Sequence, residues 1–379
     1  MKLIHTADWH LGKLFYGRTL TDEQEWILKN QFLPMIDEER PDAVILAGDV
    51  YDRSVPPAEA VALFDDMVAE IVQRRKIPFL VISGNHDSAE RLSFASGLLR
   101  GEGLYMCGEL MKTADPVFLE DQWGTVAFVP LPFAEPAEVR MALQDDTIHD
   151  YEAAERALSA ALLARVPQNC RRVAVAHAFL SGGAPSDSER PLSIGGSDQI
   201  PADIFQPYHY TALGHLHGPQ KAGADNIRYS GSLLKYSFGE ARQKKGVLAV
   251  DLDGQGRTDI RFVPLVPRRD VRIIQGRFAD IMAAPDQGSD DFLLIRLEDE
   301  EPVIDGMARL RMKYPSVMAL EALGRNNADA GTRENIPGKV TEQDLFRTFS
   351  QEFRKQELSE KEEIYMNHLW EDILKEGNL

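Results

Sequence analysis

The sequence predicts an α/β fold, and three observations support this prediction. Short apolar runs alternate with longer segments that have helical periodicity. Several of these runs end in glycine followed at once by a polar residue, at the point where open α/β sheets place their ligands. The chain has 379 residues, of which 44% are hydrophobic, enough for a large core and more than one domain.

Composition limits the class of protein. The net charge is −18, so the chain is not a general DNA binder that neutralises phosphates with many lysines and arginines. No run resembles a signal peptide, and none has the ~18 apolar residues of a membrane span. The two cysteines, Cys107 and Cys170, form no Cys-x-x-Cys pair, which argues against a disulfide framework or a thiolate zinc site. We expect a reduced, cytoplasmic protein without a membrane partner.

The first two predicted strands each deliver a carboxylate. Residues 2–6 form a strand, and Asp8 and His10 follow it at a spacing that points both side chains to one side in extended backbone. Residues 43–47 form a buried strand that ends in glycine, and the next residue, Asp49, has two oxygens that can bridge two cations. Alone, Asp-x-His is a weak signal, and an isolated Gly-Asp more often caps a helix or shapes a turn.

Two helices are expected around the second strand, over residues 21–39 and 58–75. Both carry wide apolar stripes at helical spacing, although Pro34 interrupts the first. Pro56 and Pro57 open the second helix, since proline fits a first turn. Core packing is the first interpretation of the stripe at 58–75, and a subunit contact is the alternative.

The strand at residues 78–83 runs into Gly-Asn-His-Asp. Asn85 offers a neutral amide oxygen, a hard ligand that suits Mn²⁺ or Mg²⁺. His86 and Asp87 suit acid–base chemistry, because a carboxylate can orient an imidazole. The alternative is a tight turn, whose geometry asparagine and aspartate tolerate.

Three more histidines stand at strand ends. His177 ends the strand at residues 172–177, and His215 and His217 follow the segment at 207–213 with a spacing that lets both face one site. The alternative for His177 is a buried histidine that only satisfies hydrogen bonds. A helix is also expected at residues 151–165 and a strand at 126–129. Two further strands, at 228–232 and 245–250, are expected to close the sandwich.

Five separate segments therefore deliver ligand-type residues. Five of the nine histidines lie among them, which chance placement does not explain. The set is Asp8, His10, Asp49, Asn85, His86, His177, His215 and His217. These are too many ligands for one cation and about right for two, with one imidazole to spare. Two metal ions ~3.5–4 Å apart promote in-line displacement at phosphorus. The oxygen and imidazole mixture favours Mn²⁺, with Mg²⁺, Fe and Zn²⁺ as alternatives.

The order of these motifs resembles that of the calcineurin-like metallophosphoesterases and, among them, the SbcD nucleases. The narrower resemblance rests on His-Thr-Ala-Asp-Trp-His-Leu-Gly at 5–12, Ala-Gly-Asp-Val-Tyr-Asp-Arg at 47–53, Ile-Ser-Gly-Asn-His-Asp-Ser at 82–88, Ala-Leu-Gly-His-Leu-His-Gly at 212–218 and Tyr-Ser-Gly-Ser at 229–232. Gly195-Gly196 and Ile200-Pro201 add to it. The resemblance covers residues 1–265 strongly and the rest loosely, and it implies two β-sheets flanked by helices.

The resemblance also implies a role for each residue of the set. One metal ion is held by Asp8, His10, Asp49 and His217. Asp49 bridges to the second ion, whose other ligands are Asn85, His177 and His215. His86 contacts the scissile phosphate and protonates the leaving oxygen, and Asp87 orients His86. Asp52 stands where archaeal relatives carry a histidine, and we assign it no role.

The activity implied by the resemblance is that of an Mn²⁺-dependent DNA nuclease. It comprises 3′→5′ double-strand exonuclease and single-strand or hairpin endonuclease activity, with the ATPase SbcC as partner and a homodimer as the assembly. The apolar helix faces at 21–39 and 58–75 are the candidate dimer surface. A phosphoesterase for small-molecule phosphate esters is the alternative, since the ligand set alone does not separate the two. A binding module with a degenerate site is disfavoured by the complete ligand set.

We expect four parts along the chain. They are a nuclease domain at 1–265, a small α/β cap at 268–323, a linker at 324–340 and a helical partner-binding tail at 341–379. In SbcD relatives such a cap contacts DNA, and a modest basic cluster is consistent with that, at Arg268, Arg269, Arg272 and Arg277. Ordinary surface charge is the alternative. The tail has capping patterns at Thr341 and Ser359, each followed by an apolar stripe. Binding to the SbcC coiled coil is expected, and folding back on the nuclease domain is the alternative.

Overall fold

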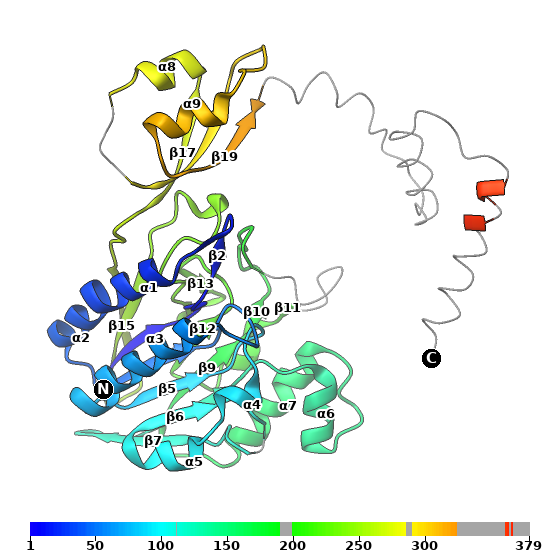
Figure 1. The fold of residues 1–379 in the computed structure, drawn as a ribbon. Helices are drawn as coiled ribbons and strands as arrows, with labels where there is room; N and C mark the ends of the chain where they lie inside the picture. The colour runs from blue at the N-terminus through cyan, green and yellow to red at the C-terminus, as the bar shows by residue number, and fades with distance from the viewer. Residues whose placement is uncertain (111, 190–198, 286–289, 324–360, 364, 367–379) are drawn as a thin grey trace. The chain divides into compact units, whose positions relative to one another are not determined.

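The structure is a computed structural model that describes residues 1–379 except 111, 190–198, 286–289, 324–360, 364 and 367–379 (Figure 1). The chain divides into two units, Met1–Leu323 and Gly324–Leu379. In the second unit only residues 361–363 and 365–366 are described, and they are helical. The predicted linker, almost all of the predicted tail, and the pair Gly195-Gly196 therefore lie outside the described residues.

Two six-stranded sheets form the centre of the first unit. In spatial order, the first sheet consists of β16 (Thr258–Pro264), β15 (Gly246–Leu252), β1 (Lys2–Thr6), β4 (Ala43–Ala47), β5 (Phe79–Ile82) and β6 (Leu104–Cys107). The second consists of β13 (Gln220–Ala222), β14 (Ala224–Tyr229), β12 (Tyr210–Gly214), β9 (Arg171–His177), β8 (Gly124–Leu131) and β7 (Val117–Asp121). Strands β1, β4 and β5 are parallel neighbours, and so are β12 and β9. The strand expected at 228–232 ends earlier, at Tyr229.

The core between the sheets explains why the strands are continuously apolar. On β4, Ile45 packs between the sheets with Phe128 and Val175 of the second sheet. The alternate residues Val44 and Leu46 face outward and pack under the helices of the first sheet. Because successive side chains of a strand point to opposite faces, a strand covered on both faces must be apolar throughout.

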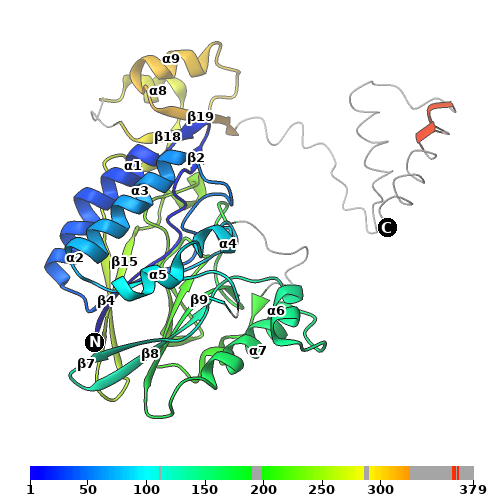
Figure 2. The same ribbon diagram turned by 60° about the horizontal axis from the view of Figure 1, so that its bottom comes forward.

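Helices cover the outer faces of both sheets (Figures 1 and 2). Those on the first sheet are α1 (Thr21–Ile27), α2 (Leu33–Glu39) and α3 (Ala58–Val68), and those on the second are α6 (Pro136–Leu143) and α7 (Tyr151–Leu163). A π-helical stretch, Leu28–Phe32, joins α1 to α2 directly before Pro34. Proline lacks the N–H that an uninterrupted α-helix needs, and the wider turn accommodates it. The expected α/β sandwich with flanking helices is therefore confirmed.

The remaining elements of this unit are short. Outside the cap region they are the π-helical stretch Ala69–Arg74 that continues α3, β2 (Leu14–Phe15), β3 (Arg18–Thr19), β10 (Phe179–Leu180), β11 (Gln199–Ile200), α4 (Ala89–Leu92), α5 (Ser96–Leu99), and the 3₁₀ turns Arg100–Glu102, Ala202–Phe205 and Phe238–Glu240. Among the residues that the structure describes, no helix is long and apolar enough to cross a membrane.

The cap region has its own three-stranded sheet. Its elements are β17 (Val271–Gly276), α8 (Phe278–Ala283), β18 (Phe292–Leu297), α9 (Gly306–Lys313) and β19 (Val317–Ala322). The strands are parallel, and both helices pack on them in a separate small core. The sequence predicts a strand, a helix and a second strand here, so α9 and β19 are additional.

Candidate metal centre

The predicted ligands follow the carboxyl ends of five central strands. Asp8 and His10 follow β1, Asp49 follows β4, and Asn85 follows β5. His177 is the last residue of β9, and His215 and His217 come directly after β12. Since these strands lie side by side as parallel neighbours in the two sheets, the structure gathers all the predicted ligands at one end of the sandwich.

The backbone at these positions adopts conformations that are rare for residues with side chains. Asp8, His10, Asp49 and His215 have φ angles of 53°, 44°, 49° and 104°. Such conformations persist where the surrounding structure enforces them, and they gather at functional sites. Close packing also requires Gly84, because a Cβ there would collide with the Asp49 carboxylate.

Asp49 lies between the two groups of ligands. Its Oδ2 is 3.4 Å from Nε2 of His10 and 3.5 Å from Nε2 of His177. Ligands about 2.1 Å from an octahedral ion are separated by roughly 3 Å along each edge. The distances therefore fit one carboxylate oxygen shared between two coordination shells.

Some hydrogen-bond acceptor atoms of the site lie close to one another, as the ligands of a cation do. Nδ1–H of His177 donates to the carbonyl of Ala47 at 3.0 Å, so in a neutral ring Nε2 carries a lone pair. That nitrogen lies 2.9 Å from Oδ1 of Asn85, another acceptor. On the other side of Asp49, Nε2 of His10 and Nε2 of His217 are 3.0 Å apart. The lone pairs of His177 and Asn85 repel at such a distance unless a cation lies between them. At the second pair one ring nitrogen can carry a hydrogen and donate it to the other, so the geometry there places two ligand nitrogens side by side without requiring an ion. The donor set fits bound metal ions.

Asp8 supplies a second sign of a missing partner. Oδ1 of Asp8 accepts the backbone N–H of His215 at 2.9 Å, whereas its buried Oδ2 has no hydrogen-bond partner among the described residues. Asp8, His10 and His217 offer ligand atoms within 4.8 Å of one another, as do Asp8, Asp49 and His177. A buried acceptor without a partner is costly, and a cation would satisfy it.

Burial sets the protonation of the site. It lowers the pKa of His10 and His177, and it lowers that of His215 to about 3, with neighbouring histidines adding to the shift at each. Burial and the charge of Asp49 raise the pKa of Asp8. Burial opposes ionisation of Asp49 too, but His177 and His86 outweigh it and hold the pKa below its usual value. The imidazoles of His10, His177 and His215 are therefore neutral, the form that binds metals.

Asp87 takes a different role from the predicted one. Its carboxylate accepts the backbone N–H groups of Val50 at 3.0 Å, Tyr51 at 2.9 Å and Gly84 at 2.9 Å. It thereby ties the turn after β4 to the turn after β5. The prediction that Asp87 orients His86 is wrong, because the local backbone turns this carboxylate toward the amides of both turns.

Asp52 holds the His86 ring instead. Nδ1 of His86 lies 2.8 Å from the backbone carbonyl of Asp52, and the backbone N–H of His86 donates to Oδ1 of Asp49 at 2.9 Å. The Asp52 carboxylate pairs with Lys13 at 2.8 Å. The His86 ring is partly exposed, unlike the buried carboxylates and imidazoles of the predicted ligand set, and packs edge-on to His10 at 4.7 Å between centroids. It thus lies at the open rim of the site.

Sequence reasoning missed the polar groups behind the ligands. Gln24 of α1 donates to the carbonyls of Trp9 and His10 at 3.0 and 2.8 Å, and Tyr236 donates to Trp9 at 2.5 Å. Others surround His217 and come from Ser188, Glu189, Glu240 and Lys245. These residues sit in no motif with ligand spacing, so no sequence signal marks them.

Comparison with known proteins identifies the family of the chain. Residues 1–219 match the family model of the calcineurin-like phosphoesterases, and residues 267–353 match a model described as the type 5 capsule protein repressor C-terminal domain. The SbcD subunit of nuclease SbcCD from Staphylococcus epidermidis (strain ATCC 12228 / FDA PCI 1200) is 34% identical over 376 residues, which cover 99% of each chain.

Two solved structures are more distant. Protein TT1561 of Thermus thermophilus is 14% identical with a TM-score of 0.39, and it covers 69% of this chain and 98% of its own. A dimetal phosphatase from Danio rerio is 12% identical with a TM-score of 0.41 and the same coverage, 69% and 98%. The sequence matches show the family. The chain belongs to the calcineurin-like phosphoesterase family, in the group of SbcD nuclease subunits, and it is a phosphoester hydrolase.

Proposed function

We propose that this protein is an Mn²⁺-dependent DNA nuclease that processes DNA ends and hairpins with an SbcC-type ATPase. The observation that carries the proposal is 34% identity, over 99% of both chains, to the SbcD subunit of a nuclease SbcCD. The proposed activities are a 3′→5′ exonuclease on double strands and an endonuclease on single strands and hairpins. Repair, recombination and replication of DNA, in the cytoplasm, are the processes that such an activity serves. Two free, buried cysteines support a reducing setting.

The proposed centre holds two divalent ions. The residues for one are Asp8, His10, Asp49 and His217, and those for the other are Asn85, His177, His215 and, again, Asp49. The position of Asp49 Oδ2 between His10 and His177 supports its bridging role. When bound, two such ions activate the nucleophile and stabilise the charge on phosphorus oxygens. Oxygen ligands mixed with imidazoles support Mn²⁺.

His86 is the proposed acid. Its Nδ1–H is directed at the Asp52 carbonyl, which leaves Nε2 available at the rim of the site. From there the imidazolium form can contact a phosphate and transfer its Nε2 proton to the leaving oxygen. Asp87 supports this role indirectly, by holding the turn that carries His86.

The test compares two substrates. Purified protein, alone and with its SbcC-type ATPase, is incubated with Mn²⁺ and end-labelled hairpin DNA, and in parallel with a phosphomonoester. The proposal predicts cleavage of the DNA and little turnover of the monoester. Fast monoester turnover without DNA cleavage would instead identify a small-molecule phosphoesterase.

A homodimer is proposed on a surface that differs in part from the one the sequence predicts. The apolar face of residues 21–39 is buried in the core of its own chain, which removes it from the candidate surface. Exposed apolar side chains lie instead at Val61 (45%), Phe94 (82%) and Leu98 (82%), on and near α3 to α5. Val61 and Phe94 line one pocket, which supports a shared surface. Light scattering at micromolar concentration would give twice the chain mass, and a monomer would contradict the dimer.

The tail at 341–379 is proposed to bind SbcC. Its stripes at Leu345, Phe346, Phe349 and Phe353, and at Ile364, Tyr365, Leu369, Trp370, Ile373 and Leu374, support a helix-in-groove contact. Deleting residues 340–379 should abolish SbcC binding in a pull-down and preserve Mn²⁺-dependent cleavage of small test substrates. Full recovery of SbcC by the truncated chain, or unfolding of the rest, would contradict the assignment.

The basic cluster of the cap gives weak support for DNA binding there. Arg268 pairs with Glu23 of α1 at 2.8 Å, and Arg272 pairs with Asp291 at 2.6 Å. Arg269 lies 3.5 Å from Asp290. Because carboxylates occupy these guanidinium groups, we favour a structural role for them at the junction with the cap.

A further inference from the structure

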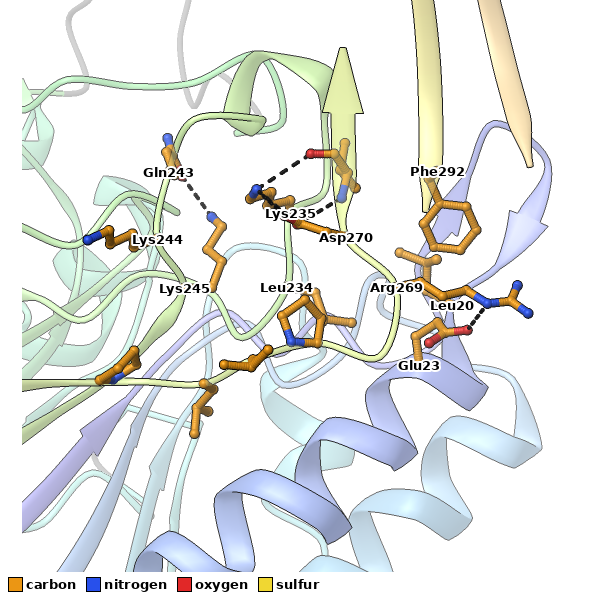
Figure 3. Close-up of a pocket in the computed structure, with 15 residues that line it drawn as sticks. Leu20, Glu23, Leu234, Lys235, Gln243, Lys244, Lys245, Arg269, Asp270 and Phe292 are labelled. Atoms are coloured by element: carbon orange, nitrogen blue, oxygen red, sulfur yellow. Dashed lines mark hydrogen bonds and ion pairs between the residues drawn. The ribbon is translucent and has the colours of Figure 1, made fainter. Parts of the chain in front are cut away.

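The segment 234–245 connects the metal centre with the start of the cap. The ring of Tyr236 packs edge-on against His10 and His217, at 5.4 and 5.6 Å between centroids. Lys235 pairs with Asp270 at 2.9 Å, just before β17. Figure 3 shows this pair, with the Lys245 side chain bonded to Gln243 farther along the same segment. The start of the segment therefore contacts both the metal centre and the residue that precedes β17.

A chain of hydrogen bonds runs from the segment to the ring of His217. Nδ1 of His217 lies 2.6 Å from Oγ of Ser188, and Ser188 donates its hydroxyl hydrogen to Oε1 of Glu240. With its hydrogen committed to the carboxylate, Ser188 Oγ acts as acceptor for the Nδ1–H of His217. The proton of the ring is thereby held on Nδ1, and the lone pair on Nε2 faces His10.

Lys245 completes this chain as the counter-charge of Glu240. Its ammonium lies 2.5 Å from Oε2 of Glu240, and the two side chains are 3% and 0% exposed. It also donates to the backbone carbonyl of His217 at 2.8 Å and to Oγ of Ser232 at 2.9 Å. The acceptor at the end of the chain is therefore a carboxylate.

We propose that Glu240 is a positioning residue that fixes the tautomer and orientation of His217 through Ser188, with Lys245 as its buried counter-charge. This inference rests on the proposed metal role of His217. Metal-binding histidines commonly donate their second ring N–H to a carboxylate, and here a serine hydroxyl lies between the two. Because this chain of hydrogen bonds ends at His217, it would affect the ion that Asp8, His10 and His217 would hold and would leave the ion at Asn85, His177 and His215 unchanged.

The test measures Mn²⁺ binding to the metal-free full-length protein by calorimetry. Ser188→Ala should weaken one of two Mn²⁺ sites about 10- to 100-fold and leave the other unchanged. Ser188→Thr, which keeps the hydroxyl, is the matched control and should bind both ions as the wild type does. Thermal unfolding of the metal-free variants establishes that each is folded.

A second pair of variants separates positioning from folding. Glu240→Gln leaves Lys245 buried without its partner and should lower the melting temperature. The double variant Glu240→Gln/Lys245→Met removes both charges, so its melting temperature should recover while one Mn²⁺ site stays weak. Two wild-type sites in Ser188→Ala or in the double variant would overturn the proposal, and so would equal weakening of both sites.

The result is distinguishable from failure of the proposed function. Wild-type protein that binds two Mn²⁺ ions but cleaves no DNA would refute the nuclease, whereas the binding data would still support Glu240. Wild-type protein that binds no Mn²⁺ would overturn both.

Discussion

The two ends of strand β9 differ in how their buried polar groups are paired. At its start, Arg171 pairs with Asp121 at 2.5 Å and donates to the carbonyl of Gly124 at 2.8 Å. The side chains of this pair are 6% and 8% exposed. At its other end, His177 faces Asp49 and Asn85, and acceptor atoms oppose one another across the gap.

The difference distinguishes a structural ion pair from a binding site. At the start of β9 the Asp121 carboxylate is neutralised by the Arg171 guanidinium and by the N-terminal ammonium of Met1 at 2.7 Å, and both hold the pKa of Asp121 low despite burial. At the end of β9, Asp8 and Asp49 are buried with neutral imidazoles, and no lysine or arginine side chain in the described part of the chain bonds to either carboxylate. Buried charges are normally paired or bound to metals, so only the second end requires ions from outside.

Asp49→Asn should have the largest effect, because it removes the oxygen shared by both groups of ligands. An amide has one acceptor oxygen and no charge. We expect DNA cleavage to fall to background and metal content to fall below two equivalents, as measured by metal analysis of the purified variant. Normal activity with two full equivalents would refute the two-metal scheme.

His86→Gln should slow DNA cleavage without causing loss of the metal ions. Because His86 lies at the rim and is proposed to act on the leaving oxygen, the variant should keep its metals and its DNA binding. Its cleavage rate should fall about 10²- to 10⁴-fold in a single-turnover assay. Loss of an ion from this variant would show that His86 is a ligand, a role that its distance to His10 and Asp49 also permits.

Arg171→Met should break the opposite end of β9. It leaves Asp121 with the N-terminal ammonium of Met1, 2.7 Å away, as its remaining charged partner, and should lower the free energy of unfolding by about 1–3 kcal/mol. Since pairing depresses the pKa of Asp121, this stabilisation is present at neutral pH and is lost only below about pH 4. Arg257→Met, at a pair whose arginine is 77% exposed, is the matched control and should change stability by less than about 1 kcal/mol. Denaturant titration measures both, and a weakened metal site in folded Arg171→Met would contradict the separation of the two ends.

Asp8→Asn, at the metal-binding end, should have the smallest effect on stability. In the metal-free protein it should raise the free energy of unfolding, whereas Arg171→Met lowers it. In the metal-free protein it removes a buried charge that lacks a partner, so the free energy of unfolding should rise by roughly 1 kcal/mol. With Mn²⁺ present, the variant should be less stable than the wild type. Destabilisation of the metal-free protein, measured by thermal unfolding, would show that Asp8 is already satisfied without metal.

The ligand positions could be predicted because each follows a strand directly. Asp49, for example, is brought to the site by the parallel pairing of β1, β4 and β5. The carboxyl ends of parallel strands lie at the same edge of a sheet, so residues that are distant in sequence become neighbours there. This proximity can be predicted without knowing the side-chain conformations. The apolar runs and the helix at 21–39 followed from periodicity in the same way.

The supporting groups could not be predicted, because their partners depend on how loops fold. Glu240 and Lys245 reach His217 from an irregular segment in which no spacing indicates a site. Asp87 had the right residue type to orient His86, but the turn geometry directs it to backbone amides. The candidate dimer face at 21–39 failed for a related reason, since an apolar stripe does not reveal whether its own core or a partner covers it.

The central claim is that the carboxyl end of the sandwich binds two cations that its buried carboxylates require. Calorimetric titration of the metal-free wild type with Mn²⁺, followed by thermal unfolding, tests it most directly. The account predicts two equivalents per chain and a higher melting temperature, with about 2.7 kcal/mol of stabilisation per site at free Mn²⁺ 100 times its Kd. One equivalent or none, or an unchanged melting temperature at saturation, would contradict it.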